Sequence, residues 1–240
     1  MAAITAEIER FNRLSTTWWN AAGPMRPLHV VNALRLSYVY DQISSHFALQ
    51  PGQALSGLRL LDVGCGGGLM SEPLAEMGAH VVGVDASAGN VAAAQIHAAN
   101  SGVAVDYRLG EPEHVLEPQE KFDVVLALEV VEHVSDMQVF LAHAASRVAP
   151  GGLLFASTID RTWRSFIIAI VGAEYIARVL PRGTHEWKRF VRPSELRQAT
   201  QAAGLIQHDL RGMRYMPVVH KASWCKSTAI NYMATFKSTL

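Results

Sequence analysis

The stretch that decides the fold is Leu58-Arg59-Leu60-Leu61-Asp62-Val63-Gly64-Cys65-Gly66-Gly67-Gly68. Residues 60–63 form a mostly apolar run, which is typical of a buried parallel strand. The glycines that follow allow a sharp turn and let the backbone approach a ligand without a Cβ in the way. Residues 69–77 then predict a helix, which Gly78 ends. Strand, glycine turn and helix together are the opening of a nucleotide-binding α/β sheet.

An acidic residue follows the glycine turn at the spacing expected of a ribose-binding acid. Residues 80–84 predict a second short strand, and Asp85 comes directly after it, 21 positions beyond Gly64. An acid about 20 residues after such a turn accepts hydrogen bonds from ribose hydroxyls. The glycines read G-x-G-x-G, whereas a dinucleotide fingerprint requires G-x-G-x-x-G and Leu69 stands at its last position. The shorter loop suits a ligand without a pyrophosphate, and the pattern resembles the first motif of S-adenosylmethionine-dependent methyltransferases.

Composition excludes several classes of protein. The chain has 240 residues, half of them hydrophobic, which suffices for one large α/β domain with additions. Lys plus Arg and Asp plus Glu both number 21, so we expect no nucleic-acid partner. The two cysteines, Cys65 and Cys225, offer neither a disulfide framework nor a CxxC metal motif, which fits a reducing compartment. No signal-like segment and no apolar span of about 18 residues is present, so we expect a cytoplasmic protein without a transmembrane helix.

From residue 58 onward, predicted strands and helices alternate, which indicates a mostly parallel sheet with helices on both faces. The predicted strands cover residues 60–63, 80–84, 103–108, 122–128, 153–157, 205–211 and 229–236. The predicted helices cover residues 4–14, 29–46, 69–77, 88–100 and 137–148, with Asp136 as an N-cap, and one more begins at residue 193.

We expect one domain over residues 1–240. It comprises an N-terminal helical arm (1–50), a cofactor-binding half (58–157), an inserted segment (160–192) and a closing helix with strands (193–240). Trp18 and Trp19 in the arm either staple it to the core or line a substrate entrance.

A segment with two carboxylates and an imidazole follows the fourth predicted strand; it reads Glu129-Val130-Val131-Glu132-His133. Ligands of open α/β sheets bind beyond the carboxyl ends of the strands. On one helical turn the two carboxylates and the imidazole would face the same way. They could hold a divalent cation that lowers the pKa of a bound hydroxyl. Alternatively, His133 acts as a general base without a metal, or the segment is only a cap and a solvated turn.

Segments along nearly the whole chain resemble the ubiquinone-biosynthesis O-methyltransferases, which act on polyprenylated phenols. The matching segments are Trp18-Trp19, Arg26-Pro27-Leu28-His29, Asn32–Leu36, Leu61–Gly68, Asp85, Glu129–Val134, Pro150-Gly151-Gly152, Val171–Ile176, Gly183-Thr184-His185, Pro193–Leu196 and Asn231-Tyr232-Met233. The glycine loop alone is typical of the whole methyltransferase superfamily. The tryptophan pair, the segment around Arg35 and Val171–Ile176 narrow the resemblance to this one family. It implies a Rossmann-like class I methyltransferase sheet with N-terminal helices and a helical lid.

The resemblance also implies roles for individual residues. Arg35 would contact the cofactor S-adenosylmethionine, and Asp85 would bind its ribose. Gly64 would approach the methionyl part, with Cys65 and Gly66 in the same loop. Leu128 stands where the family has an apolar cofactor contact. Residues 110–120 depart most from the family pattern, and Glu111 would hydrogen-bond the adenine amine there.

The resemblance implies a metal and a lipid substrate as well. Glu129, Glu132 and His133 occupy the positions proposed in the family for a cation such as Mg²⁺. The substrates would be 2-polyprenyl-6-hydroxyphenol and 3-demethylubiquinol, which partition into lipid. Residues 163–190 combine an apolar run with flanking cations and tryptophans. This pattern predicts contact with an anionic membrane surface, and therefore a peripheral location at the inner membrane. Other ubiquinone-biosynthesis enzymes are further candidate partners.

Two alternatives stay open at this point. One is a methyltransferase for another lipophilic small molecule. The other is an NAD-type oxidoreductase or a non-catalytic nucleotide-binding module on the same kind of sheet. Leu69 argues against the dinucleotide enzyme, and the acidic segment after residue 128 argues against an inert module.

Overall fold

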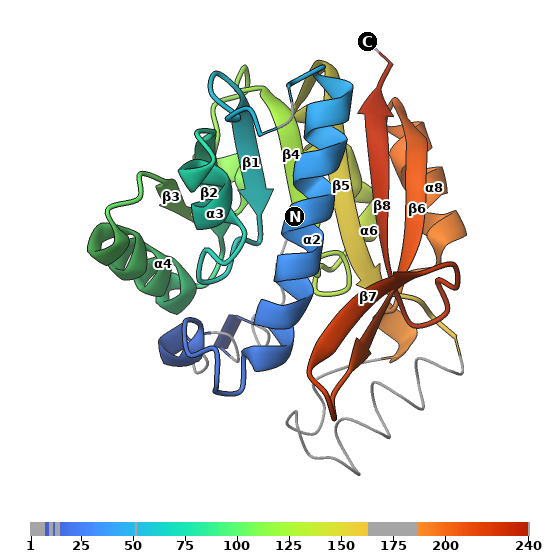
Figure 1. The fold of residues 1–240 in the computed structure, drawn as a ribbon. Helices are drawn as coiled ribbons and strands as arrows, with labels where there is room; N and C mark the ends of the chain where they lie inside the picture. The colour runs from blue at the N-terminus through green and yellow to red at the C-terminus, as the bar shows by residue number, and fades with distance from the viewer. Residues whose placement is uncertain (1–7, 10–11, 13–14, 51, 163–186, 240) are drawn as a thin grey trace.

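The computed structural model describes residues 8–9, 12, 15–50, 52–162 and 187–239. Its centre is an eight-stranded sheet with the order β3-β2-β1-β4-β5-β8-β6-β7 (Figure 1). The strands are β1 (Arg59–Val63), β2 (His80–Asp85), β3 (Asp106–Leu109), β4 (Phe122–Leu128), β5 (Val148–Ile159), β6 (Leu205–Met216), β7 (Lys221–Cys225) and β8 (Asn231–Ser238).

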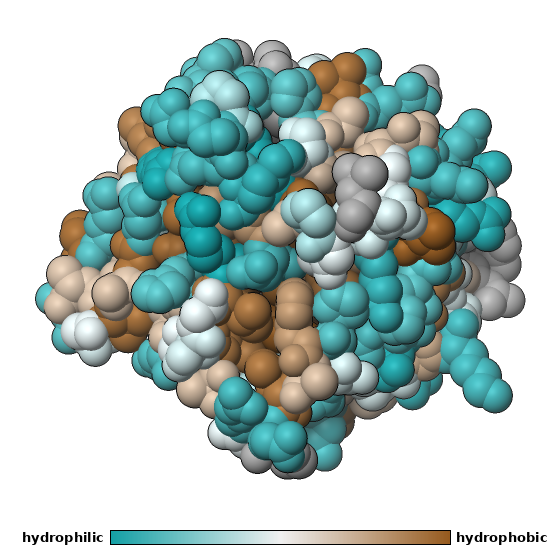
Figure 2. Space-filling view, turned by 90° about the horizontal axis from the view of Figure 1, so that it is seen from above, coloured by the Kyte–Doolittle hydropathy of each residue, from teal (hydrophilic) through white to brown (hydrophobic). Residues whose placement is uncertain are grey.

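The first five strands pair in parallel, and β8 joins β5 and β6 by antiparallel pairing. The sheet is therefore mostly parallel, as the sequence predicts. The parallel strands run downward in Figure 1, so their carboxyl ends share the lower edge. Figure 2 looks onto the opposite edge from above, and hydrophilic residues cover much of that face, with smaller hydrophobic patches between them.

Helices cover both faces of the sheet. They are η1 (Ser15–Thr17), α2 (Arg26–His46), α3 (Ser71–Glu76), α4 (Ala88–Ser101), α5 (Pro112–Val115), α6 (Met137–Ser146), η3 (Trp187–Arg189) and α8 (Pro193–Ala202). No helix among the described residues is long and apolar enough to cross a membrane.

Two hydrophobic clusters hold these layers together, because side chains alternate between the faces of a strand. On one face, Leu60, Val124 and Leu153 pack with Val39 and Ile43 of α2. On the other face, neighbouring residues of the same strands pack against α6 and α8; they include Leu61, Val125, Leu154, Phe140, Leu141 and Leu196. The strands are hence buried on both sides, which explains their nearly continuous apolar sequences.

Several local predictions are confirmed. β4 occupies the predicted residues 122–128. Asp136 caps α6, because its Oδ1 accepts hydrogen bonds from the amides of Gln138 (2.9 Å) and Val139 (3.1 Å).

Other boundaries differ from the predictions. α3 starts at Ser71 instead of residue 69, β5 and β6 are longer than predicted, and β7 has no predicted counterpart. Most of the predicted helix at 4–14 and most of the inserted segment, residues 163–186, lie outside the described residues.

Candidate active site

The glycine loop follows β1 at the carboxyl edge of the sheet. Gly64 and Gly66 have φ angles of +73° and +56°, which disfavour residues with a Cβ. The amides of Gly64 and Cys65 both donate to the carbonyl of Val84, at 2.8 and 3.1 Å. The loop is therefore tied to the end of β2, the strand that carries Asp85. Cys65 is buried, and this burial raises the pKa of its thiol.

Asp85 lies beside this loop, as its spacing predicts. Its Oδ2 accepts a hydrogen bond from the amide of Gly66 (2.9 Å), and its Oδ1 accepts from the amide of Ser87 (2.8 Å). The side chain of Asn90 also donates to Oδ1, at 3.2 Å. Burial raises the pKa of Asp85, whereas these three donors act in the opposite direction. The carboxylate is thus held in one orientation at the edge of the glycine loop.

The open side of the loop is not empty. Trp18 is 7% exposed, and a Cβ placed on Gly66 would come within 2.7 Å of its indole ring. The sequence reasoning reserves the space at Gly66 for a ligand, but in this conformation a side chain of the N-terminal arm fills it. Of the two interpretations for Trp18, the staple between arm and core is therefore confirmed.

A second group of polar residues lies at the end of β4. Arg35 of α2 is 1% exposed and forms an ion pair through Nη2 with Oε1 of Glu129. Its Nη1 donates to Oδ1 of Asn32 (3.0 Å). Glu129 also accepts from the hydroxyl of Ser157 (2.9 Å) and from Nδ2 of Asn231, at 3.3 Å to Oε1 and 3.4 Å to Oε2. Two strands, β5 and β8, and one helix, α2, therefore supply the partners of this single carboxylate at the end of β4.

Strain and unsatisfied groups mark this end of β4. Glu129 has a φ of +55°, a left-handed conformation that is unfavourable for a residue with a Cβ. Two buried polar atoms beside it, Nε of Arg35 and Oδ1 of Asn231, have no hydrogen-bond partner. Unpaired buried polar atoms are costly, and one of these is a donor and the other an acceptor. The pair matches a polar ligand that can both accept and donate a hydrogen bond.

Glu132 and His133 complete the site. Glu132 is buried and accepts a hydrogen bond from the hydroxyl of Thr158 (2.8 Å). Burial, followed by the negative charge of Glu129, raises the pKa of Glu132 from 4.5 to about 7, and the charge of His133 opposes this rise. His133 is half-buried, and its amide donates to the carbonyl of Val130 (2.9 Å). A strongly raised carboxyl pKa in a buried polar group is a feature typical of active sites.

Comparison with known proteins decides the family. A family model described as a methyltransferase domain matches residues 35–207. Ubiquinone biosynthesis O-methyltransferase from Methylobacterium nodulans is 51% identical over 229 residues, which cover 95% of this chain and 92% of that protein. The enzyme of the same name from Brucella anthropi is 48% identical over 230 residues, or 95% of this chain and 93% of that one. This chain belongs to the ubiquinone biosynthesis O-methyltransferase family.

Solved structures agree with this fold. Magnesium protoporphyrin IX methyltransferase from Synechocystis PCC 6803, with bound SAH, has a TM-score of 0.67 at 18% identity and covers 98% of this chain and 95% of that one. N-methyltransferase NodS from Bradyrhizobium japonicum, also with SAH, has a TM-score of 0.62 at 16% identity, and both chains are covered completely. The methyltransferase is thus S-adenosylmethionine-dependent, and the oxidoreductase alternative is set aside.

The methyltransferase brings the predicted cofactor residues to one edge. Leu128 is the last residue of β4 and is half-buried. Glu111 precedes α5, and the neighbouring amide of Gly110 donates to the carbonyl of Asp85 (2.9 Å). Glu111 therefore lies next to the end of β2. Arg35 differs from its predicted role in one respect, because its Nη2 is already engaged by Glu129.

The helical turn predicted for residues 129–133 is wrong. This segment forms a non-helical bend and turn, since Glu129 has a left-handed backbone. Among the described residues, the set whose three ligand atoms lie within 4.8 Å of one another is Glu111, Glu113 and His114, and not Glu129, Glu132 and His133. The donor set of the latter group suits a divalent cation, but its ligand atoms are not gathered in this conformation.

Sequence reasoning gave no role to several residues of the methyltransferase site. These are Asn90, Ser157, Thr158 and Asn231. Ser157 and Thr158 lie near the carboxyl end of β5, the strand next to β4, which was a usable signal because the carboxyl ends of neighbouring strands meet. Asn231 belongs to a segment that resembles the family, but only the antiparallel pairing of β8 with β5 reveals its position.

Proposed function

We propose that this methyltransferase transfers a methyl group from S-adenosylmethionine to phenolic hydroxyls of polyprenylated ubiquinone precursors, namely 2-polyprenyl-6-hydroxyphenol and 3-demethylubiquinol. The main support for the proposal is that two groups of residues share the carboxyl edge of the sheet. The glycine loop and Asp85 lie at the same end of the sheet as the strained, under-satisfied group around Glu129. The names of the relatives support the substrate class.

The cofactor would lie along the carboxyl ends of β1, β2 and β4. Asp85 would accept hydrogen bonds from the ribose hydroxyls, after its carboxylate releases the amide of Gly66 or shares it. Gly64, Cys65 and Gly66 would border the methionyl part, Leu128 would provide an apolar contact, and Glu111 would take the adenine amine. The unpaired Nε of Arg35 would donate to the cofactor's carboxylate, while Nη2 stays with Glu129.

Methyl transfer is an in-line displacement at carbon. The oxygen–carbon bond forms as the carbon–sulfur bond breaks, and S-adenosylhomocysteine leaves. The protein mainly has to align oxygen, carbon and sulfur and to remove the phenol proton. Without a bound cation, His133 would accept this proton on its imidazole. Glu129, fixed by Arg35 and Ser157, would orient the phenol or the imidazole.

A divalent cation such as Mg²⁺ would be held by Glu129, Glu132 and His133. When bound, it would lower the pKa of the phenol oxygen. The support is the donor set and the raised pKa of Glu132, since that buried carboxyl is disfavoured as an anion until a positive charge compensates it. Isothermal titration with Mg²⁺ and Zn²⁺ tests this, with Glu132→Gln as the variant. Full methyl transfer after thorough chelation would remove the cation and leave His133 as base.

The membrane contact is the third part of the proposal. Residues 163–186 lie outside the described residues, and the support is their sequence and the lipophilic substrate class. Purified protein is expected to sediment with anionic vesicles at low salt and to release as salt rises. Replacement of Ile167, Ile168 and Ile170 by serine should reduce sedimentation while leaving S-adenosylhomocysteine binding intact. Equal binding of parent and triple variant would contradict the contact.

One assay tests the central proposal. Purified protein, labelled S-adenosylmethionine and a short-tail demethylubiquinol should give labelled ubiquinol, and S-adenosylhomocysteine should bind where NADH does not. Asp85→Ala should weaken S-adenosylhomocysteine binding by about ten- to a hundred-fold, because a charged acceptor is lost. If the protein methylated an unrelated lipophilic phenol and left demethylubiquinol unmethylated, the alternative would be favoured, in which the acceptor is another lipophilic small molecule.

A further inference from the structure

One indole fills the open side of the glycine loop. A Cβ placed on Gly66 would lie 2.7 Å from Cη2 of Trp18, and one on Gly67 would lie 2.4 Å from Cγ of the same ring. Both distances are far below van der Waals contact, so the ring lies flat along two successive glycines. In this conformation, the missing side chains of Gly66 and Gly67 make room for Trp18.

The same indole reaches the ribose-binding acid through one residue. Nε1 of Trp18 donates to Oδ1 of Asn90 at 2.8 Å, in a buried hydrogen bond. Nδ2 of Asn90 donates to Oδ1 of Asp85 at 3.2 Å. An indole N–H can only donate, and it therefore selects the amide orientation that presents the oxygen to Trp18. The amide nitrogen is then the group that faces Asp85.

Removing the indole N–H removes one of the two groups that select this orientation, and the carboxylate of Asp85, which only accepts, remains as the other. The side chain of Asn90 would then be anchored at one end and would hold the carboxylate less firmly. The orientation that the three donors together give Asp85 would be weakened accordingly.

Other contacts hold Trp18 in place. Nε2 of His29 lies 2.8 Å from the carbonyl of Trp18. The next residue, Trp19, donates from Nε1 to the carbonyl of Gly67 (2.8 Å) and stacks on His97 with centroids 3.4 Å apart. Asn12 accepts from the amide of Gly89, at the start of α4 (2.9 Å). The arm is thus fixed to the glycine loop and to α4, the two elements that border Asp85.

We propose that Trp18 is a positioning residue for the methyl donor: through Asn90 it orients the carboxylate of Asp85, and through its ring it fixes the glycine loop. The inference rests on the proposed function, because it takes Asp85 to be the ribose acceptor. Its consequence is that part of the cofactor affinity resides in the N-terminal arm, outside the sheet.

The test compares two substitutions at one position in the full-length protein. Trp18→Phe keeps most of the ring and removes the N–H, whereas Trp18→Ala removes both. Titration calorimetry with S-adenosylhomocysteine should show a loss of about three- to ten-fold for Trp18→Phe, as expected for one hydrogen bond. Trp18→Ala should lose more. KM for the methyl donor should rise with it, while KM for the demethylubiquinol stays unchanged.

Controls separate positioning from general damage. Trp224→Phe makes the same chemical change at a half-buried tryptophan that packs against Tyr38, and it should leave affinity at the parent value. In an Asn90→Ala background, Trp18→Phe should cause little further loss of affinity, since the hydrogen-bond relay from Trp18 through Asn90 to Asp85 is already broken. If Trp18→Ala does not fold, the comparison of Trp18→Phe with and without Asn90→Ala still tests the proposal. If the parent binds S-adenosylhomocysteine and Trp18→Phe binds it equally, or if its effect persists without Asn90, the relay is wrong. If the parent does not bind, the proposed function itself fails.

Discussion

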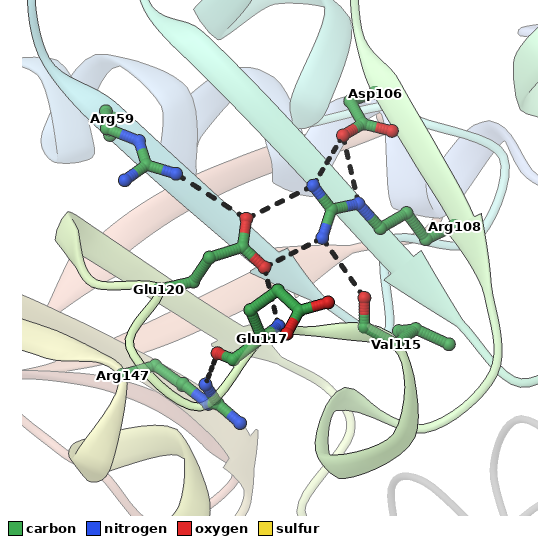
Figure 3. A network of polar contacts seen from close by, with 7 residues as sticks. All are labelled: Arg59, Asp106, Arg108, Val115, Glu117, Glu120 and Arg147. Carbon is green, nitrogen blue, oxygen red and sulfur yellow. Dashed lines mark hydrogen bonds and ion pairs between the residues drawn. The ribbon is translucent and has the colours of Figure 1, made fainter.

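The two ends of β4 carry the same kind of ion pair and differ in how completely it is satisfied. At the amino end, Glu120 receives two bonds from Arg108, Nη1 to Oε2 at 2.9 Å and Nη2 to Oε1 at 3.2 Å (Figure 3). Arg59 lies 3.6 Å from Oε1, and the amide of Glu117 donates to Oε2 at 2.8 Å. Hydrogen bonding to Arg108 is the main cause that holds the pKa of Glu120 below its usual value.

At the carboxyl end, Glu129 also has an arginine, but its surroundings are incomplete. Its backbone is left-handed, Arg35 and Asn231 keep unpaired buried atoms, and the neighbouring Glu132 has its pKa raised to about 7. A pair such as Glu120–Arg108, whose charged atoms have their partners within the protein, serves to stabilise the fold. Strain, unpaired groups and an unneutralised acid are costs that persist where a ligand later relieves them. The difference between the two ends therefore supports the proposed site at the carboxyl end.

The largest effect should come from the imidazole at the carboxyl end. His133→Ala is expected to lower kcat by about 10²- to 10⁴-fold, because a general base is lost. S-adenosylhomocysteine affinity should stay at the parent value, since His133 would act on the phenol, as base or as metal ligand, and not on the cofactor. His143→Ala on α6 replaces another half-buried histidine away from this edge, and its kcat should be unchanged. If the His133→Ala enzyme kept the parental kcat, the catalytic role proposed for the carboxyl end of β4 would be wrong.

Next in size is the comparison of the two arginines. Arg35→Lys should weaken methyl-donor binding by about ten- to a hundred-fold, because an ammonium cannot serve Asn32, Glu129 and a ligand in the same planar geometry. Arg108→Lys should reduce thermal stability and leave the donor affinity unchanged. Calorimetric titration and thermal unfolding of both variants check this. Equal losses of affinity at both positions would show that the amino-end network also supports the site.

A smaller effect concerns stability against pH in metal-free protein. The folded-state pKa of Glu132 is about 7, above its usual 4.5. The folded state thus keeps a proton that the unfolded state has released, and the free energy of unfolding should fall as pH rises from about 4.5 to 7. At about 1.4 kcal/mol per pKa unit, the fall is on the order of 3 kcal/mol. Urea unfolding in EDTA at pH 5 and pH 8 should show a larger fall in the parent than in Glu132→Gln, since the raised pKa of the buried Asp62, about 6, contributes to the fall in both proteins.

The smallest effect has the opposite sign. The pKa of Glu120 is lowered in the folded state, so its contribution is present above the usual value and is lost as pH falls through the folded-state value. Because the network is partly exposed to solvent, Glu120→Gln should cost only about 1 kcal/mol at neutral pH. The gap between parent and variant should close in acid. A gap that widens on acidification would contradict the assigned ion pairs.

Local chemistry made much of the fold predictable. The glycine loop, Asp85 at the end of β2, the buried run of β4 and the cap at Asp136 each depend on neighbouring residues in sequence. β7 was missed because Lys221–Cys225 is short and partly exposed, without a strong apolar alternation.

The site was predictable only in part, for a similar reason. The residue types near Glu129 were visible in the sequence, and their side-chain partners were not. Arg35, Ser157 and Asn231 meet Glu129 from positions far along the chain, and the left-handed φ of Glu129 replaces the predicted helical turn. Trp18 likewise depends on a long-range contact, since nothing near it in sequence indicates Gly66 or Asn90.

The position of β8 has a consequence for how the enzyme acquires its activity. β8 lies between β5 and β6 although it follows both in sequence, so β5 keeps an open edge until residues 231–238 insert. An uncovered strand edge is prone to pairing with another chain, and non-local pairing of this kind is slow. Asn231 is the first residue of β8, so Glu129 gains this partner only in that late step. Substitutions that weaken β8 should therefore reduce the yield of native protein through aggregation during folding, while the molecules that do fold keep their kcat.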